Sequence, residues 1–417
     1  MVNYKAYFEI PEKNEKRKFV KGSAPHLLDI FLTELRDACE IEVSFFLYNN
    51  PYLHKFFEEE SNKGCKITIV TIPISGYDSK LVQVKANHLQ SINTSKKIYA
   101  EKILKRVQEG LSNIELRYYP HTNIWYRQET SRGHDSYALH NKSVLAKFPN
   151  GNIKCISSSC NFALGDPLHS ENLLIIENCE ATTKMFTKYM DLLKNNSLTV
   201  NEYYKFKREN QDFQFVSQPI DLKDEFNNCC YFTAPFITYD KIGSNHFVQQ
   251  KIVDFLNSAT NRIYLCSQHI SDINPFDKNA QSIVNTIGEI AKNNNIGVKI
   301  LKQTRTANQI QGNRTKQAEN YLKSIPSIEQ KYCFPTIHDK FLIVDNSILV
   351  TTANFTCTQF AWAENHRMKY YNENDNTEFS VNNTFSDINS FHFINNQKLV
   401  DSYLKHFKIL WNISDIV

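Results

Sequence analysis

The stretch from His338 to Asn354, HDKFLIVDNSILVTTAN, decides how this chain folds. Two short apolar runs, FLIV and ILV, are separated by Asp345-Asn346-Ser347, which are residue types that favour turns. The pattern predicts a β-hairpin whose midpoint, residue 346, lies inside the turn. His338 and Asn354 are equally far from that midpoint, so we expect them to meet at the open end of the hairpin.

The first half of the chain contains a longer copy of this hairpin, HNKSVLAKFPNGNIKCISSSCN, from His140 to Asn161. Its midpoint falls between Asn150 and Gly151, and Asn-Gly is a preferred two-residue hairpin turn. The sequence therefore predicts the same arrangement in both halves, with a histidine, a lysine and an asparagine at one end of a hairpin.

The residue types at that end suit a phosphate group. Side chains two apart on a strand point to the same face, so each His-x-Lys presents an imidazole beside an ammonium group. Asn161 precedes Glu171 by ten residues, and Asn354 precedes Glu364 by the same distance. A carboxylate near a catalytic histidine can fix the tautomer and orientation of the imidazole. We therefore expect both glutamates to orient the histidines.

The elements around the hairpins also occur twice. The first half has expected helices at 25–39, 52–62, 96–110 and 181–195 and strands at 41–48, 66–73 and 113–119. The second half has expected helices at 246–259, 280–294, 314–323 and 398–412 and strands at 262–268, 297–303 and 327–333. This repetition predicts an α/β fold with two pseudo-twofold-related lobes, each a mixed β-sheet flanked by helices. The predicted boundaries are 1–195 and 246–417 for the lobes and 196–245 for a linker or insertion.

These residues carry a resemblance to a known family. HDKFLIVD resembles the H-x-K-x-x-x-x-D signature of the phospholipase D superfamily, and TTAN stands where that family usually has G-S-x-N. HNKSVLAK with SSCN is similar, with Lys147 in place of the aspartate, which the midpoint places near the turn and away from the histidine. The long first hairpin resembles the tyrosyl-DNA phosphodiesterase variant. The resemblance implies a phospholipase D-like fold whose two motifs meet between the lobes.

The resemblance also implies a two-step reaction through a phosphohistidine, with no metal ion and no other cofactor. It assigns His140 as the nucleophile and His338 as the acid, while lysines and asparagines bind the phosphate oxygens. The expected catalytic residues are His140, Lys142, Asn161, Glu171, His338, Lys340, Asn354 and Glu364. The expected substrate-binding residues are Ser159 and Thr352 in the motifs, and Lys302, Arg305 and Arg314 in a basic rim with Lys80, Lys85, Lys96, Lys97 and Lys316. His134, His169 and His366 lack metal-ligand spacing, so packing or solvated roles are expected for them.

The composition limits the choice of substrate and compartment. The 417 residues carry a net charge of +4, ten scattered cysteines, no signal-like apolar segment at the N-terminus and no run long enough for a membrane helix. We therefore expect a cytoplasmic protein, a monomer or homodimer whose active site is completed within one chain, with free thiols and without stable membrane insertion.

The function expected from these features is that of a nuclease, with DNA a more suitable partner than RNA and phage defence a fitting role. One alternative is a soluble phospholipase D or phosphatidyl transferase that acts at a membrane surface. A further alternative is a non-catalytic nucleic-acid-binding module with a degenerate first motif, which the substitution Lys147 would favour.

Overall fold

Two mixed β-sheets of the same strand order form the centre of the protein. The computed structural model describes residues 2–10, 26–72, 99–110, 114–119, 136–164, 169–209, 218–220, 229–234, 236–239, 247–273, 281–293, 296–303, 312–333, 337–356, 359, 367–372, 377–382 and 385–416. The first sheet contains, in spatial order, β1 (Asn3–Glu9), β8 (Glu171–Glu177), β7 (Ile153–Ser158), β6 (Lys142–Lys147), β2 (Glu40–Phe45), β3 (Lys66–Thr71), β4 (Ile114–Tyr118) and β9 (Leu198–Thr199). The second contains β11 (Cys229–Thr233), β20 (Phe385–Ile394), β17 (Ser347–Thr351), β16 (Lys340–Val344), β13 (Arg262–Ser267), β14 (Gly297–Gln303), β15 (Ile328–Cys333) and β21 (Asp415–Ile416).

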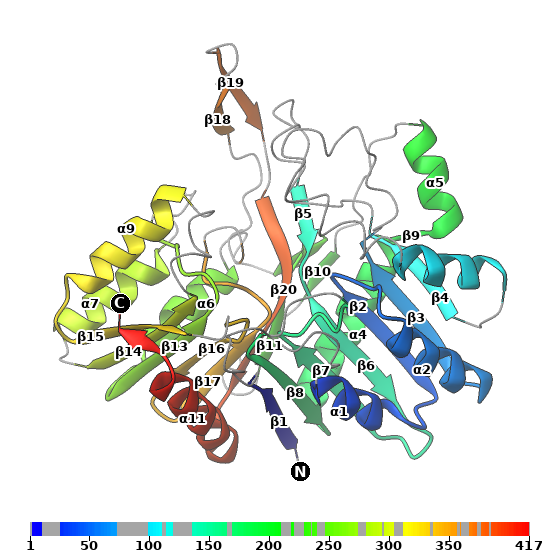
Figure 1. The fold of residues 1–417 in the computed structure, drawn as a ribbon, viewed down its shortest axis with the longest axis horizontal. Helices are drawn as coiled ribbons and strands as arrows, with labels where there is room; N and C mark the ends of the chain where they lie inside the picture. The colour runs from blue at the N-terminus through cyan, green and yellow to red at the C-terminus, as the bar shows by residue number, and fades with distance from the viewer. Residues whose placement is uncertain are drawn as a thin grey trace, which may run out of the picture.

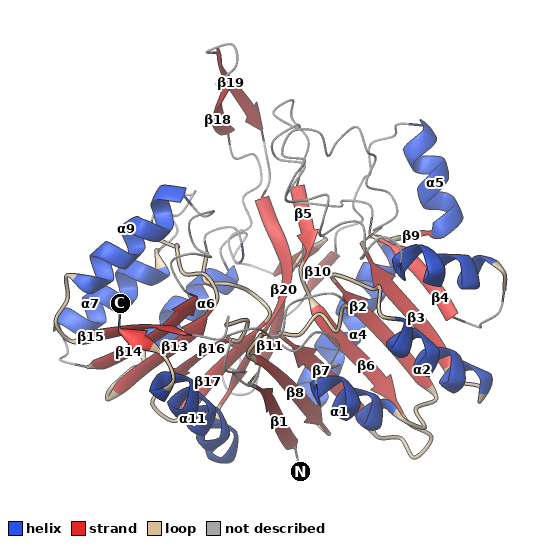
Figure 2. Cartoon of the chain, viewed as in Figure 1, coloured by secondary structure: helices blue, strands red, loops and turns tan. Residues whose placement is uncertain are grey.

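Helices flank both sheets, as Figure 2 shows. The first half contributes α1 (His26–Leu35), α2 (Pro51–Asn62), α4 (Glu180–Asn195) and α5 (Val200–Glu209). The second half contributes α6 (Phe247–Asn257), α7 (Ile283–Asn293), α9 (Gly312–Lys323) and α11 (Gln397–Asn412). The expected α/β fold with two related mixed sheets is confirmed, because each strand of the first sheet has a counterpart at the same place in the second. None of the described helices is long and apolar enough to cross a lipid bilayer.

The stretch 196–245, predicted as a linker, contributes a strand to each sheet. Leu198–Thr199 of β9 pairs with β4 at the edge of the first sheet, and β11 pairs with β20 in the second. A two-stranded parallel sheet of β10 (Gln218–Ile220) and β12 (Ile237–Tyr239) also lies in this stretch. The segment that belongs to neither lobe is therefore shorter than the sequence indicated, because edge strands of two to five residues have too little periodicity to be recognised.

The two halves are joined through their β-structure. The short strand β5 (Ser136–Leu139), from the first half, pairs in parallel with the beginning of β20 from the second half, and Figure 1 shows the two side by side in the centre of the molecule. On the other side, α4 packs on β11, where the rings of Tyr189 and Phe232 stack with centroids 4.0 Å apart. The lobes therefore share one interface that includes backbone hydrogen bonds, and β5 leads directly into His140.

A hairpin of β18 (Arg367–Asn372) and β19 (Thr377–Asn382) precedes β20 and extends away from both sheets at the top of Figure 1. The first half has no room for a counterpart, because only ten residues separate Asn161 from Glu171, where β8 begins. The two copies therefore differ in length between the hairpin and the strand that follows it.

One buried polar group stands out in the core between the halves. His392 of β20 is buried, and within the described residues neither of its ring nitrogens has a hydrogen-bond partner. Its ring centroid lies 5.8 Å from that of Phe186, and burial lowers the pKa of the imidazole to about 3. The N–H of Ser159 donates to the carbonyl of Asn172, and the N–H of Thr352 donates to that of Ser390, so Asn172 and Ser390 occupy equivalent positions. Two residues further along each strand, Leu174 of β8 is therefore the counterpart of His392.

Replacing this histidine with the residue of its counterpart, His392→Leu, is expected to stabilise the protein. An unpaired buried polar group costs about 1–3 kcal/mol, so the free energy of unfolding at pH 7.5 should rise by about that amount. The unfolded histidine binds a proton below about pH 6.5, and the folded one does so only near pH 3. The wild type should therefore lose stability relative to the variant as the pH falls between those values. Urea unfolding of the wild type and of His392→Leu at pH 7.5 and 5.5 measures the difference in their free energies of unfolding. If the two proteins are equally stable at both pH values, the prediction is contradicted.

Candidate active site

Both predicted hairpins form with the expected turns. In the first, β6 pairs with β7 in a register that joins Ser143 to Ser157, and Gly151 lies in the turn with a φ of 82°. In the second, β16 pairs with β17, and Phe341 faces Val350. The histidine and the asparagine of each motif therefore flank the same end of a hairpin.

The aspartate that distinguishes the two motifs has a structural task away from that end. The carboxylate of Asp345 accepts hydrogen bonds from the backbone N–H groups of Thr260, Asn261 and Arg262 at 2.7–2.9 Å, which ties the turn to the start of β13. Lys147 stands at the matching place in the first half, where its ammonium group lies 2.8 Å from Glu40 on β2. The missing aspartate therefore changes how the strands are joined and leaves the histidine end unaltered.

Each motif histidine is attached to the opposite half by its backbone. The N–H of His140 donates to the carbonyl of Ile388 at 3.1 Å, and the N–H of His338 donates to the carbonyl of Ser170 at 2.9 Å. These two bonds are equivalent in the pseudo-twofold arrangement. They bring the ends of the two hairpins together between the sheets, where the residues that follow Ser170 and Ile388 face the imidazoles.

Glu171 contacts His338, the histidine of the other half. Its carboxylate oxygens lie 2.8 and 2.9 Å from Nδ1 of His338, and Oε2 also accepts a hydrogen bond from the hydroxyl of Ser159 at 2.5 Å. Glu171 is 6% exposed. A carboxylate at Nδ1 requires that nitrogen to donate, so the other ring nitrogen, Nε2, is the one available to a substrate.

Asn389 takes the equivalent place beside His140. Its Oδ1 lies 3.0 Å from Nδ1 of His140 and accepts a hydrogen bond from the hydroxyl of Thr352, also at 3.0 Å. The sequence reasoning did not identify Asn389, because it counted ten residues from Asn354 and reached Glu364 instead. Glu364 lies outside the described residues, so its role stays a prediction. A search for the strand that corresponds to β8, in place of a fixed spacing, would have led to Asn389.

The two motif lysines are buried at the same site. Lys142 and Lys340 are 1% and 0% exposed, and each ammonium group donates to the carbonyl of the histidine two residues before it, at 2.5 and 2.6 Å. Burial lowers the pKa of Lys340 to about 8, although the carboxylates of Glu171 and Asp339 act in the opposite direction. Buried ammonium groups that keep their charge at neutral pH are suited to bind a phosphate.

The imidazoles respond to this burial and to the positive charges. Burial, followed by the charges of Lys142 and Lys340, lowers the pKa of His140 well below its ordinary value, and His338 contributes in the same direction. Burial lowers the pKa of His338 to about 4 even though Glu171 opposes that change. Burial raises the pKa of Glu171, but the neighbouring His338 and His169 outweigh it and hold that pKa below the usual range. The mutual influence of His140, Lys340 and His338 indicates that both motifs face one site.

The two asparagines complete the ends of the hairpins. Asn354 is 7% exposed, and its backbone N–H donates to the side chain of Gln359 at 3.1 Å. Its Oδ1 is buried and has no hydrogen-bond partner among the described residues. Asn161 follows β7 at the matching place. Both asparagines therefore stand at the hairpin ends that carry the motif histidines.

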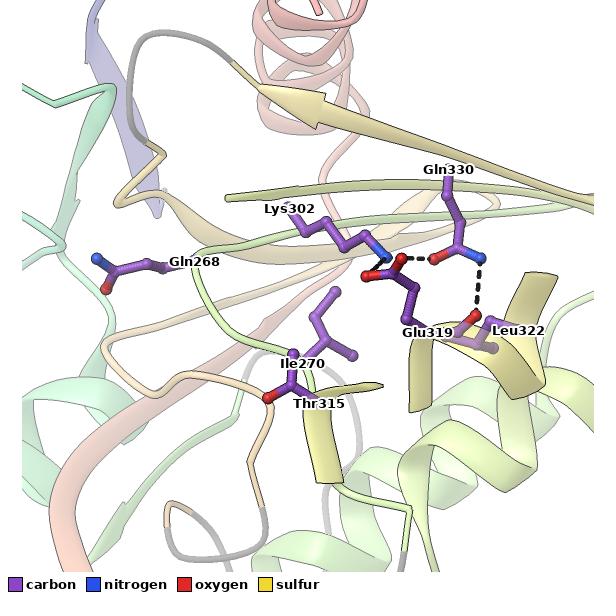
Figure 3. A pocket seen from close by; sticks show the side chains of 7 residues that line it. All are labelled: Gln268, Ile270, Lys302, Thr315, Glu319, Leu322 and Gln330. Atoms are coloured by element: carbon purple, nitrogen blue, oxygen red, sulfur yellow. Dashed lines mark hydrogen bonds and ion pairs between the residues drawn. The ribbon is translucent and has the colours of Figure 1, made fainter. Parts of the chain in front are cut away.

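Of the predicted basic rim, only Lys302, Arg314 and Lys316 lie among the described residues. Lys302 is 4% exposed, with its ammonium group 3.3 Å from Glu319 and 2.7 Å from the amide oxygen of Gln330, and Figure 3 shows the three side chains along a small pocket. The expectation that Lys302 lines an exposed rim is therefore wrong, because α9 covers the end of β14 and Glu319 neutralises the lysine. Arg314 is half-buried on the same helix, and its charge acts on Asp272. Arg305 and the predicted rim lysines Lys80, Lys85, Lys96 and Lys97 lie outside the described residues.

His169 lies closer to the site than its sequence context indicated. Its Nδ1 is 3.8 Å from Glu171, and its ring centroid is 5.3 Å from that of His338. These three residues present one nitrogen or oxygen atom each within 4.8 Å of one another, a donor set that a transition metal can accept. A metal ion would have to replace the hydrogen bond between His338 and Glu171 and would lie near the ammonium group of Lys340. We therefore assign the trio to proton chemistry.

Comparisons with known proteins agree with this geometry. A family model described as the phospholipase D-like domain of cardiolipin synthase matches residues 252–388, which include the second motif. No curated protein shows a significant sequence match. Among solved structures, phosphatidylserine synthase from Haemophilus influenzae is similar in fold, with 12% identity, a TM-score of 0.54, and coverage of 94% of this chain and 85% of that one. Polyphosphate kinase from Porphyromonas gingivalis has 9% identity and a TM-score of 0.51 over 99% of this chain, which spans about half (48%) of the kinase's length.

The segment that matches the family model includes the second hairpin motif, and the fold repeats that segment's strand order in the first half. The matched segment carries His338, Lys340 and Asn354, and the first half repeats both its strand order and its His-x-Lys hairpin. Residues 252–388 therefore match a phospholipase D-like family model, and the first half of the chain repeats the strand order of that segment.

Proposed function

We propose that this chain is a phosphodiesterase that acts through a phosphohistidine without a metal ion, and that it is a nuclease with DNA as its substrate. The observation that carries the proposal is the crossed attachment of the two motif histidines, each of which hydrogen-bonds to the opposite half. Two imidazoles with different partners and two buried lysines at one site are suited to in-line displacement at phosphorus.

In the first step, His140 attacks and His338 donates a proton. The lone pair on Nε2 of His140 forms the N–P bond, the bond from phosphorus to the leaving oxygen breaks, and that oxygen takes the proton from Nε2 of His338. His338 suits the acid role because Glu171 stabilises its protonated form. His140 suits attack because its neighbour Asn389 is neutral, so the imidazole keeps its lone pair beside an anionic substrate.

In the second step, water releases the product. His338, now neutral, removes a proton from the water, whose oxygen bonds to phosphorus as the N–P bond breaks and its electron pair returns to His140. Lys142 and Lys340, with Asn161 and Asn354, bind the non-bridging oxygens in both steps and offset the charge that develops on them. The positive charge that a metal ion supplies in other phosphodiesterases would thus come from two lysines.

The choice of DNA rests on charge. The chain carries a net charge of +4, and the sequence predicts a basic rim that includes Lys80, Lys85, Lys96, Lys97 and Arg305. A polyanionic backbone gains affinity from such a rim through the release of counterions, whereas a lipid surface would call for exposed apolar side chains. Among the described residues, the exposed large apolar side chains are Val2, Tyr52, Ile409 and Ile416. None of the hydrogen bonds and ring contacts given above joins one of them to a motif residue.

The substrate is tested with four labelled probes in parallel, each in the presence of EDTA. The probes are single- and double-stranded DNA, RNA of the same sequence, and phosphatidylglycerol vesicles. We expect cleavage of DNA that EDTA does not reduce and that falls by about 10³-fold or more in His140→Asn. His26→Asn, at an exposed histidine of α1, is the matched control and should retain full activity.

Each other outcome has a defined meaning. Lipid hydrolysis without DNA cleavage would replace the nuclease with a phospholipase, and preferential cleavage of RNA would change the substrate within the same class. Loss of cleavage with EDTA would contradict the metal-independent mechanism. DNA binding without cleavage of any probe would favour the non-catalytic module.

A further inference from the structure

A buried chain of hydrogen bonds continues behind Asn389 and ends in a carboxylate. The amide nitrogen of Gln359 donates to Oδ2 of Asp387, and its amide oxygen lies 3.3 Å from Nδ2 of Asn389, which donates to it. Gln359, Asp387 and Asn389 are 4%, 1% and 0% exposed. The chain thus runs Asp387, Gln359, Asn389, His140.

We propose that Gln359 and Asp387 are positioning residues for His140, which fix its imidazole as the tautomer with the proton on Nδ1. Neither residue belongs to the motifs from which the catalytic set was predicted. The statement about the tautomer stands on the hydrogen bonds alone. Its consequence for catalysis rests on the proposed function, in which Nε2 of His140 is the attacking atom.

The direction of the chain follows from what each group can donate. An ionised carboxylate only accepts, so Asp387 requires the NH₂ group of Gln359 to face it. The amide oxygen of Gln359 then faces the other way, where it accepts from the backbone N–H of Asn354 at 3.1 Å and from Nδ2 of Asn389. One carboxylate therefore determines the orientation of two amide groups in succession.

The orientation of Asn389 in turn decides the tautomer of His140. Nδ2 of Asn389 also lies 3.2 Å from the backbone carbonyl of Gln359 and 3.3 Å from that of Asp387. These carbonyl groups can only accept hydrogen bonds, so the NH₂ group of Asn389 must point toward them. Its Oδ1 is left facing Nδ1 of His140 and the hydroxyl of Thr352. An acceptor at Nδ1 selects the imidazole with its proton there and leaves the lone pair on Nε2.

The two sides of the site therefore use a carboxylate differently. His338 touches Glu171 directly, so its protonated form gains a negative neighbour. Two neutral amides, those of Gln359 and Asn389, separate His140 from Asp387. They orient the hydrogen bond to the imidazole without placing a negative charge beside it. Asn389 follows Asn354 by 35 positions, whereas Glu171 follows Asn161 by ten. The longer segment of the second half supplies both Gln359 and Asp387.

The tautomer can be observed without any substrate. In ¹⁵N–¹H correlation spectra of protein with ¹⁵N-labelled histidine, the signal absent from His140→Gln identifies His140. We expect the wild type to have the proton on Nδ1. Gln359→Met, which keeps the length of the side chain but can neither donate to Asp387 nor accept from Asn389, should give a mixture of both tautomers. Asp387→Asn replaces the acceptor-only carboxylate with an amide that can also donate to Gln359, so it should likewise populate the other tautomer.

Kinetics then test the positioning role. Phosphohistidine formation in Gln359→Met should slow by about 10–100-fold, the usual effect of removing a residue that orients a reacting side chain, with little change in KM. Asp387→Asn should slow the same step, because its amide no longer fixes the orientation of Gln359. A wild-type signal with the proton on Nε2, or a folded Gln359→Met variant with the wild-type tautomer and rate, would overturn the proposal. Because the spectra need no substrate, the tautomer is tested even if no probe is cleaved or if Gln359→Met does not fold.

Discussion

With a DNA oligonucleotide that ends in a p-nitrophenyl phosphodiester, His338→Asn is expected to release p-nitrophenol and to retain the nucleotide as a covalent adduct on His140. This leaving group needs no proton, so attack by His140 proceeds without the acid. The second step still needs a base to activate water, and its rate should fall by about 10³-fold. The adduct is measured by rapid denaturation and mass spectrometry of the peptide that contains His140.

The reciprocal variant separates the two histidines. His140→Asn removes the attacking atom, so it should give neither adduct nor fast release of p-nitrophenol. The exposed control His26→Asn should turn over as the wild type does. An adduct on His338 in His140→Asn would reverse the assigned roles, and turnover by both single variants would refute a shared site.

Glu171→Gln is expected to reduce the cleavage of ordinary DNA by about 10²-fold or more, and the cleavage of the p-nitrophenyl ester much less. Glutamine still accepts a hydrogen bond from Nδ1 of His338, but it removes the negative charge that stabilises the protonated imidazole. An alkoxide leaving group needs that proton and p-nitrophenolate does not. The ratio of single-turnover rates for the two substrates measures the difference.

The control for this variant removes a carboxylate elsewhere. Glu40→Gln breaks the ion pair with Lys147 at the far end of the first hairpin and should leave both rates within about twofold of wild type. Equal losses on both DNA substrates in Glu171→Gln would mean that Glu171 only supports the fold of the site, and the acid role of His338 would then lack its electrostatic basis.

Local sequence patterns predicted the hairpins because their causes are local. Short apolar runs and the Asn150-Gly151 and Asp345-Asn346 turns set the register, so the histidine and the asparagine of each motif flank the same hairpin end. Many of the helices and strands were also predicted within a few residues, for example α11 at Gln397–Asn412 for an expected 398–412, but the central strands β8 and β20 were not. The edge strands were missed, because their few residues carry no clear period.

Residue counting failed where the two copies differ in length. Equal spacing correctly indicated Glu171 as a neighbour of a histidine, but it could not say that this histidine is His338, 167 residues away. In the second half the added residues put Asn389 in the corresponding place, 249 residues from His140. The exposure of Lys302 was predicted wrongly because its partner Glu319 comes from α9, and no local sequence pattern determines where that helix packs.

The sequence by itself determined the hairpins, the repeated order of helices and strands, and the histidine, lysine and asparagine set of each motif, because these follow from side-chain periodicity and turn chemistry. Only the tertiary structure decided that each histidine is held by the opposite half, with a carboxylate at one and a neutral amide at the other. Those partners meet through sheet pairing across the interface between the halves, a contact that depends on the packing of the whole chain.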